Sequence, residues 1–200
     1  MSDNDFFEYS YNPGFFYNFK HKKKLNKIFT NNYLSPLINA KNNILDIGFY
    51  ATNELIKISN TFRSSRIIGI DVFKKRMKTL SHSIKDINNI HVVYGDINNL
   101  DFEHNYFDII SSINSFYFAQ EANTVLNKIS SFIKKKGILI LTLDIFDDIS
   151  SDNKLIYDKN NISYKIFKTE EILKLLKENK FKNIKTETIN NNLVLYCEKR

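Results

Sequence analysis

A repeated alternation between short apolar runs and segments with helical spacing constrains the fold of this chain most strongly. The apolar runs span residues 44–47, 66–70, 90–94, 107–113 and 137–143. Between them, apolar residues recur at helical spacing over residues 52–62, 73–84 and 125–133. This alternation is typical of a parallel sheet that is covered by helices on both faces. The runs are rich in Ile, Leu and Val, as expected for strands buried on both sides.

The two ends of the chain depart from this alternation. We expect a helix over 169–179 and then strands over 183–189 and 193–199, joined as a hairpin by asparagines that tolerate left-handed backbone. This hairpin would give the sheet an antiparallel edge. Residues 144–168 are polar and too long for a plain connection, so they are a candidate lid.

The N-terminal part reads as a cap on a single domain over residues 1–200. Aromatic residues crowd positions 1–19 without a clean period, and helical spacing follows over 22–37, with Pro36 near its end. We therefore expect residues 1–40 to form a helical and aromatic cap. A chain of 200 residues is long enough to bury a core of its own.

Composition excludes several classes of protein. No apolar run reaches the length of about 18 residues that a membrane-spanning helix needs. The acidic, aromatic start does not resemble a signal peptide, and the single cysteine, Cys197, excludes a disulfide scaffold. We therefore expect a cytoplasmic protein. The net charge of +7 comes from lysines spread along the chain, so nucleic-acid binding is not favoured.

Carboxylates follow three of the predicted strands. These strands end in Asp46-Ile47-Gly48, Gly69-Ile70-Asp71 and Gly95-Asp96. In an open α/β sheet, ligands bind beyond the carboxyl ends of the strands. Asp71 can accept hydrogen bonds from a ribose diol, and Asp96 can accept one from the exocyclic amine of a purine. Gly48 permits a close turn of the backbone beside the ligand.

The first of these carboxylates also excludes ligands. Asp46 is a poor neighbour for a pyrophosphate but suits a cationic amino-acid or sulfonium group. The chain contains neither G-x-G-x-x-G nor G-x-x-x-x-G-K-[ST], so NAD, FAD and P-loop nucleotide sites are not expected.

From residue 42 onward the chain resembles the class I S-adenosylmethionine (SAM)-dependent methyltransferases, most closely their type 11, ubiquinone-biosynthesis-like branch. The resemblance rests on five segments in family order, which are "NILDIGFYATNELIKIS", "RIIGIDVFKKRMKTLSHSI", "HVVYGDINNLDFEHNYFDIISSINSFYF", "VLNKISSFIKKKGILILT" and "TEEILKLLKENKFKNIKTE". It implies a Rossmann-like, seven-stranded, mostly parallel α/β sheet in the order 3-2-1-4-5-7-6, with strand 7 antiparallel.

The resemblance also implies a set of cofactor-binding residues. Asp46 and Gly48 would flank the methionine part of SAM, where Tyr50 also falls. Asp71 would hold the ribose, and Ser112 to Ser115 would line the site near the transferred methyl group. The full set is Asp46, Gly48, Tyr50, Asp71, Val72, Asp96, Ile97 and Ser112. The product would be S-adenosylhomocysteine (SAH).

Two departures leave an alternative open. Tyr50 and Thr52 stand where the first motif of the family has its second and third glycines. A non-glycine residue at a position that needs positive φ costs roughly 1–2 kcal/mol. The alternative is a degenerate methyltransferase fold that does not bind SAM and acts as a protein partner or scaffold. The three retained carboxylates speak against it.

A small-molecule acceptor, methylated on O, N or C, is the favoured substrate. After the fourth strand the chain reads Ser112-Ile113-Asn114-Ser115, not the Asn/Asp-Pro-Pro-Tyr motif that clamps an exocyclic amine, which argues against an RNA or protein methyltransferase. The candidate substrate residues are Tyr9, Tyr11, Tyr17 and Asn114.

No catalytic residue can be assigned from the sequence. Methyl transfer depends mainly on alignment and the exclusion of water, so it does not require a visible base. His104 is the only plausible general base. No metal is expected, because the spacing of Asp144, Asp147, Asp148 and Asp152 favours a solvated loop over a metal site.

Overall fold

The computed structural model describes residues 27–29, 34–49, 52–72, 74–144, 155–157, 163–165, 167–189 and 192–200. Seven of its strands form one sheet, and these are β1 (Asn43–Ile47), β2 (Arg66–Asp71), β3 (Ile90–Tyr94), β4 (Phe107–Ile113), β5 (Ile133–Asp144), β8 (Phe181–Ile189) and β9 (Asn192–Lys199). The helices around it are α3 (Thr52–Thr61), α4 (Lys74–Ser83), α5 (Ala122–Phe132) and α6 (Thr169–Glu178).

The order of the strands is β3-β2-β1-β4-β5-β9-β8. The pairs from β3 to β5 are all parallel, whereas β9 runs antiparallel to both β5 and β8. Within this sheet β8 is the sixth strand along the chain and β9 is the seventh. The predicted Rossmann-like order 3-2-1-4-5-7-6, with strand 7 antiparallel, is therefore confirmed.

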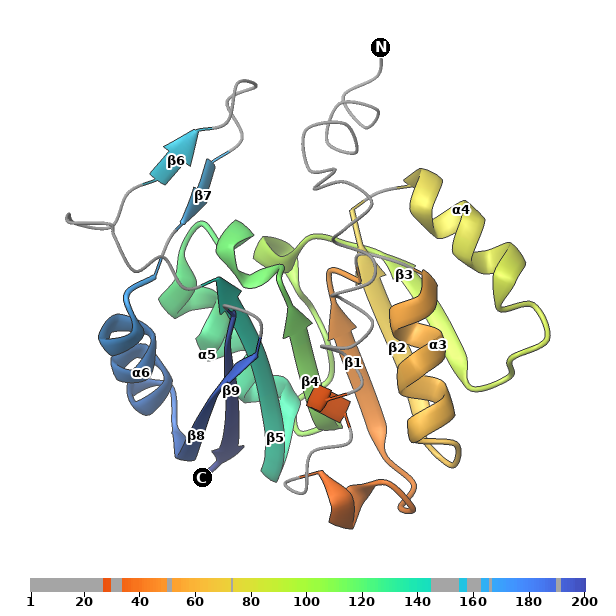
Figure 1. Ribbon diagram of the computed structural model, residues 1–200, viewed down its shortest axis with the longest axis horizontal. Helices are drawn as coiled ribbons and strands as arrows, with labels where there is room; N and C mark the ends of the chain where they lie inside the picture. Colours follow the sequence, from red (N-terminus) through yellow and green to blue (C-terminus); the bar gives the residue numbers. More distant parts are fainter. Residues whose placement is uncertain are drawn as a thin grey trace.

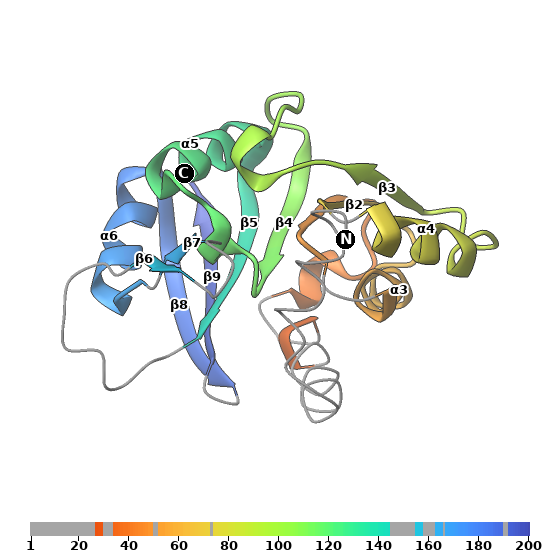
Figure 2. The ribbon, with the colours of Figure 1, turned by 90° about the horizontal axis from the view of Figure 1, so that it is seen from above.

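The two faces of the sheet carry separate hydrophobic cores. Helices α5 and α6 cover one face, and α3 and α4 cover the other (Figures 1 and 2). Successive strand residues point to opposite faces, so Leu45 joins the α5 and α6 core while Ile44 joins the α3 and α4 core. In β5, Leu139 and Ile140 divide in the same way. Burial on both faces explains the continuous apolar runs of the sequence.

The register of the strand pairs aligns the carboxyl ends of β1, β2 and β4 at one edge of the sheet. Asp46 of β1 pairs with Gly69 of β2 and with Ser111 of β4. Gly69 also allows α3 to lie close to the sheet, because a Cβ atom there would lie 2.4 Å from Leu55 Cδ1. The residues that follow β1, β2 and β4 are thereby gathered at one place.

The start of β5 differs from the prediction. The helical spacing extends to residue 133, but α5 ends at Phe132, and Ile133 already pairs with Phe107 of β4. The register then shifts, so that Ile109 pairs with Ile138. The lysine-rich stretch between them bulges, and Lys136 adopts a left-handed conformation with φ of 65°. Ile133 is fully buried as a strand residue, and the bulge leaves the lysines at the surface.

Two further boundaries differ from those expected. Strand β8 begins at Phe181, two residues early, because a bulge near Asn183 (φ 50°) lets the strand continue past Lys182. The predicted helix over 22–37 does not continue to its end, since residues 35–37 form a separate 3-10 turn, η1 (Ser35–Leu37). Pro36 lies in this turn, where its missing N–H and its effect on the preceding residue disfavour a continuing α-helix.

A second, two-stranded antiparallel sheet lies within the candidate lid. It consists of β6 (Leu155–Tyr157) and β7 (Ser163–Lys165). In Figure 1 it lies beyond the tips of β4 and β5, at the carboxyl edge of the large sheet. Phe167, just after β7, packs on Phe116 of the 3-10 turn η3 (Phe116–Phe118), with ring centroids 5.5 Å apart. That the whole of 144–168 acts as a lid stays a prediction.

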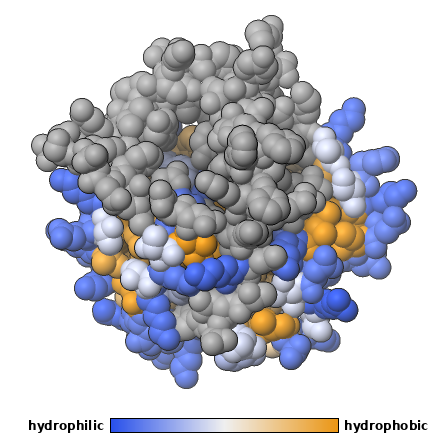
Figure 3. All heavy atoms as spheres, viewed as in Figure 1, coloured by the Kyte–Doolittle hydropathy of each residue, from blue (hydrophilic) through white to orange (hydrophobic). Residues whose placement is uncertain are grey.

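The surface of the described residues agrees with the composition. Hydrophilic side chains form the outer flanks of the molecule, and hydrophobic ones show only in separate areas between them (Figure 3). None of the helices in the described ranges combines the length and the apolar character needed to cross a membrane. The cytoplasmic location and the single-domain division stay predictions.

Candidate functional site

Three carboxylates gather at the carboxyl edge of the sheet. Asp46 lies near the end of β1, Asp71 ends the neighbouring β2, and Glu54 lies in the first turn of α3. All three are buried, with exposed fractions of 1%, 3% and 1% in that order. Carboxylates are rarely buried to this degree unless they have partners, so this cluster marks a specialised region.

Asp46 is the most constrained member of the cluster. Its Oδ1 accepts a hydrogen bond of 2.6 Å from Ser111 Oγ, whereas Oδ2 is buried without a hydrogen-bond partner in the described part of the chain. Burial raises the pKa of Asp46 to about 8, and the negative charges of Glu54 and, more weakly, Asp71 contribute to this rise. The hydrogen bond from Ser111 acts in the opposite direction and lowers the pKa. Burial in this cluster therefore favours the protonated form of the Asp46 carboxyl group.

The turn after β1 is locked to the end of β4. Gly48 has φ of 73° and donates its N–H to the carbonyl of Ile70 at 2.8 Å. Ser115 Oγ donates to the carbonyl of Ile47 at 2.5 Å, and its Cβ would lie 2.4 Å from a Cβ on residue 48. Glycine is thus required at position 48 both by its backbone and by Ser115. Ser112 is fully buried and its Oγ lies 2.6 Å from Ser115 Oγ, so this hydroxyl is already paired.

The residues predicted to meet the purine and the ribose lie at neighbouring strand ends. The carbonyl of Asp71 accepts the Gly95 N–H at 3.1 Å, which joins the ends of β2 and β3. Asp96 Oδ1 accepts hydrogen bonds of 2.9 Å from both the backbone and the side-chain nitrogen of Asn98. Asp96 thereby caps the short turn η2 (Ile97–Asn99), which fixes the direction of its carboxylate. Ile97 is buried and Val72 is half-buried.

Asn114, predicted to contact the substrate, is held rigidly just after β4. It has φ of 53°, a conformation that asparagine tolerates better than most residues. Its N–H donates to Thr142 Oγ1 at 2.9 Å, and that hydroxyl donates back to Asn114 Oδ1 at 2.7 Å. The side chain is 6% exposed, so it lies at the inner end of the site.

Sequence reasoning overlooked several residues that build this site. Ser111 and Thr142 form hydrogen bonds that the sequence motifs do not indicate. The sequence motifs do not indicate Glu54 either, although it is an acidic residue in the first turn of α3. It lies four positions before Ile58, which places both on one face of α3, and both are buried. The position of Glu54 on the same helical face as the apolar Ile58 was the sequence pattern that indicated a buried acid.

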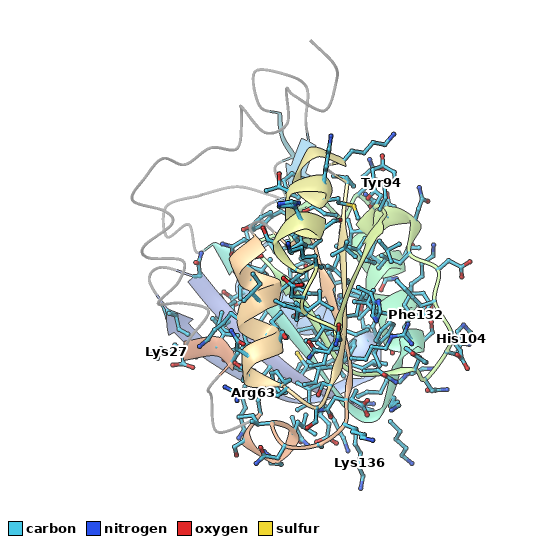
Figure 4. The ribbon with its side chains drawn as sticks, turned by 90° about the vertical axis from the view of Figure 1, so that its right-hand side faces the viewer. Lys27, Arg63, Tyr94, His104, Phe132 and Lys136 are labelled. Atoms are coloured by element: carbon cyan, nitrogen blue, oxygen red, sulfur yellow. The ribbon has the colours of Figure 1, made fainter. Side chains whose placement is uncertain are left out.

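His104 lies at the opposite end of the sheet from the carboxylates. It belongs to the loop before β4, and its ring lies 6.4 Å from that of Phe132 at the end of α5. Figure 4 shows it beside Phe132, well away from Tyr94 at the carboxyl end of β3. His104 therefore cannot serve as a general base at this site.

Other predicted residues lie outside the described part of the chain. These are Tyr9, Tyr11, Tyr17, Tyr50, Asp147, Asp148 and Asp152, together with the side chains of Thr52 and Asp144. Across the described ranges, no group of three or more His, Cys, Asp or Glu side chains is arranged to hold a metal ion.

Comparison with known proteins supports the methyltransferase resemblance for the central part of the chain. Residues 45–141 match the family model of a methyltransferase domain, from the last residues of β1 to the middle of β5. Residues 45–141 therefore form a methyltransferase domain of the type 11 family. The resemblance inferred from the sequence is thereby confirmed. No curated protein matches the methyltransferase chain by sequence.

Solved structures share the methyltransferase fold at low sequence identity. The YcgJ protein of Bacillus subtilis is 14% identical with a TM-score of 0.70, over 90% of this chain and 99% of that one. The CurJ carbon methyltransferase is 16% identical with a TM-score of 0.65, over 79% of this chain, which spans only 48% of that one. The [4+2]-cyclase SpnF is 13% identical with a TM-score of 0.71, over 90% of this chain and 80% of that one.

The family implies SAM as the cofactor, and the residues present fit this molecule. The unpartnered Oδ2 of Asp46 needs a hydrogen-bond partner, which the amino-acid end of SAM can supply. The three buried carboxylates suit a ligand with cationic and hydroxyl groups, and they would repel a phosphate. The chemistry of the donor set therefore agrees with the family.

Proposed function

We propose that this methyltransferase transfers a methyl group from SAM to a small-molecule acceptor, on an oxygen, nitrogen or carbon atom. The observation that carries this proposal is the buried, unpartnered Oδ2 of Asp46 at the carboxyl edge of the sheet. A buried polar oxygen without a hydrogen-bond partner costs about 1–3 kcal/mol, which a hydrogen-bonding group of the ligand would recover.

Each residue of the site has a role in this proposal. Asp46 accepts hydrogen bonds from the amino-acid end of SAM, and Asp71 accepts them from the ribose hydroxyls. Val72 and Ile97 supply apolar surface for the purine, and Asp96, fixed by Asn98, accepts from its exocyclic amine. When bound, SAM supplies an already activated methyl group, so the protein contributes orientation and the exclusion of water.

The acceptor is proposed to bind between Asn114 and the small β6 and β7 sheet. Asn114 is fixed by Thr142, and the packing of Phe167 on Phe116 attaches the end of the β7 segment to the end of β4. Both features lie on the same edge of the sheet as the carboxylates.

One observation favours a second candidate, a fold that no longer methylates. Ser115 fills the space beside Gly48 from within the protein, and Tyr50 and Thr52 replace two motif glycines. A closed site of this kind would suit a protein that acts through a partner. Among its structural neighbours, SpnF is a [4+2]-cyclase, so this fold also supports chemistry other than methyl transfer.

Calorimetric titration with SAM and SAH distinguishes the two candidates. We expect micromolar binding, with at least a tenfold loss in Asp71→Asn, whose buried carboxylate would hold the ribose. Asp86→Asn is the matched control, because Asp86 is an exposed aspartate outside the site. Absence of binding at millimolar ligand would reject methyl transfer in favour of the closed site. Transfer of labelled methyl from SAM to a panel of small molecules would then define the acceptor.

A further inference from the structure

The lysine-rich bulge of β5 lies at the end of the sheet opposite to the carboxylates. Residues Lys134–Lys136 fall between Ile133 and Ile138, the two residues of β5 that pair with β4 on either side of the bulge. Figure 4 shows Lys136 at the opposite end of the molecule from Tyr94, which ends β3. The proposed function gives this run of positive charges no role, although like charges held together repel one another.

The fold brings two further lysines from the end of the chain to this bulge. Lys199 of β9 donates hydrogen bonds to the carbonyl of Ser130 and, at 3.4 Å, to the carbonyl of Ile133. Burial and then the charge of Lys180, which lies just before β8, lower the pKa of Lys199. The group formed in this way is called the basic patch, and it consists of Lys135, Lys136, Lys180 and Lys199.

The basic patch is short of negative charge. The lysines on either side of it have acidic partners, since Lys134 Nζ lies 2.9 Å from Asp108 and Lys182 Nζ lies 3.1 Å from Glu198. Within the described ranges, no carboxylate forms a salt bridge with a lysine of the patch itself. Except for the half-buried Lys199, the patch is exposed. It can therefore receive an anionic partner.

The backbone gives an independent indication that a positive charge is favoured at two of these positions. Lys136 and Lys180 have φ of 65° and 68°, a left-handed conformation that a lysine adopts at a cost. Asparagine tolerates this conformation better. In the described ranges, the three other left-handed residues that are not glycine are Asn105, Asn114 and Asn183. Both left-handed lysines thus belong to the basic patch, where the charge is kept in place of the residue that suits the backbone.

The chemistry of the basic patch fits phosphate groups better than a lipid surface. A protein that lies on a membrane inserts apolar side chains beside its cations. Among the described residues, the exposed large apolar side chains are Val93 and Tyr94, on β3. Strand β3 is one edge of the sheet, whereas β8 and β9 lie at the other. A lysine ammonium is a compact charge with three donors, which suits phosphate oxygens in many orientations.

We propose that the basic patch is a docking surface for the phosphodiester backbone of a nucleic acid. Lysines spread along the sequence did not favour such a partner, but the fold gathers four of them. Contacts to phosphates position a nucleic acid without reading its bases, so binding should depend on charge and not on sequence. The patch lies at the opposite end of the sheet from the carboxylates, so the nucleic acid would localise the protein and would not be its methyl acceptor. This inference is independent of the proposed function.

Fluorescence anisotropy with a labelled single strand of about 20 nucleotides measures this binding. An RNA and a DNA of the same sequence are the two probes, and we expect them to bind alike. Each phosphate neutralised on a single strand contributes about −0.7 to the slope of log K against log salt concentration, so four lysines predict a slope of up to about −3. A preference of more than tenfold for one probe would show recognition beyond the phosphates and overturn the assignment.

Lys136→Asn combined with Lys180→Asn tests the patch without disturbing its backbone, because asparagine tolerates the left-handed conformation. We expect the salt slope to fall by about half and the binding at about 50 mM salt to weaken at least tenfold. Lys136→Arg combined with Lys180→Arg keeps the charges and should retain the binding. Lys78→Gln combined with Lys85→Gln removes two exposed lysines elsewhere and should bind as the wild type does.

The other outcomes would each overturn the proposal. Equal weakening in the asparagine and glutamine variants would assign the binding to net charge and not to the patch. Unchanged binding by a folded asparagine variant would place the nucleic acid elsewhere. Absence of binding by the wild type at low salt would reject the docking surface, and co-sedimentation with phosphatidylglycerol vesicles in that case would favour a membrane instead.

Discussion

Replacement of Asp46 by asparagine tests the buried carboxylate through stability, without any ligand. In the folded protein the pKa of Asp46 is raised from its ordinary value of 3.8 to about 8, first by burial and then by the charge of Glu54. The unfolded chain ionises near the ordinary value. Between these two pKa values the folded state therefore binds one more proton than the unfolded state does.

The sign of the pH dependence follows from this difference. The contribution of Asp46 to stability is fully present below its unfolded pKa and is lost as pH rises through its folded pKa. The loss has a slope of up to about 1.4 kcal/mol for each pH unit. Summed over the window from 3.8 to about 8, it is on the order of 5 kcal/mol. This is a large part of the stability of a typical domain, about 5–15 kcal/mol.

Asp46→Asn removes this pH-dependent loss of stability, but the asparagine introduces a smaller destabilisation of its own. The side-chain oxygen of an asparagine can still accept from Ser111, but its NH₂ group would lie where Oδ2 lacks a partner, at a cost of about 1–3 kcal/mol. We therefore expect Asp46→Asn to be less stable than the wild type near pH 4 and more stable near pH 8. The two stability curves should cross between these values.

Urea denaturation from pH 4 to 9, followed by circular dichroism, measures both curves. Asp86→Asn, which changes an exposed aspartate, should follow the wild type throughout. Parallel curves for Asp46→Asn and the wild type would mean that Asp46 ionises normally in the folded protein. The buried cluster would then hold no additional proton near neutral pH.

Two further substitutions test the backbone of the site and of the sheet. Gly48→Ala should lower the free energy of unfolding by at least about 2 kcal/mol, because residue 48 has positive φ and its Cβ would collide with Ser115. Addition of Ser115→Gly should recover part of this loss in a double-mutant cycle, whereas strict additivity would show that Ser115 is not the obstacle. Lys136→Gly should raise the free energy of unfolding by about 0.5–1 kcal/mol, since Lys136 is left-handed in the bulge of β5. Lys135→Gly, at a neighbouring residue without positive φ, should lower it by a similar amount, and equal effects of the two lysine variants would contradict the bulge.

The order of the sheet was predictable because it follows from patterns that extend over many residues. Alternating strands and helices specify a doubly covered sheet, and the carboxylates after three strands mark its binding edge. Local boundaries were less predictable. Ile133 fits the helical spacing of α5 as well as it fits a strand, and only its pairing with Phe107 decides between the two.

The sequence predicts the place of a site residue when that place follows from a strand end alone. It predicts less well the properties of a residue that depend on side chains from other elements. Asp71 ends β2, so its place follows from the strand alone. The character of Asp46 depends on Glu54 and Ser111, which approach it from two other elements. Asp96 shows the same limit, because its hydrogen bonds to Asn98 give it a capping role beside any contact with a ligand.

The short segment of Asn114 and Ser115 has a mechanical consequence. Asn114 is bonded to Thr142 of β5, and its neighbour Ser115 is bonded to Ile47 of β1. Two consecutive residues therefore brace three adjacent strands, with the proposed acceptor position on one side and Gly48 on the other. A shift of Asn114 toward an acceptor would pull on the Gly48 turn through a single peptide unit. The proposed acceptor position and the Gly48 turn are therefore mechanically connected. Binding of the acceptor should change the affinity for the cofactor, and binding of the cofactor should change the affinity for the acceptor.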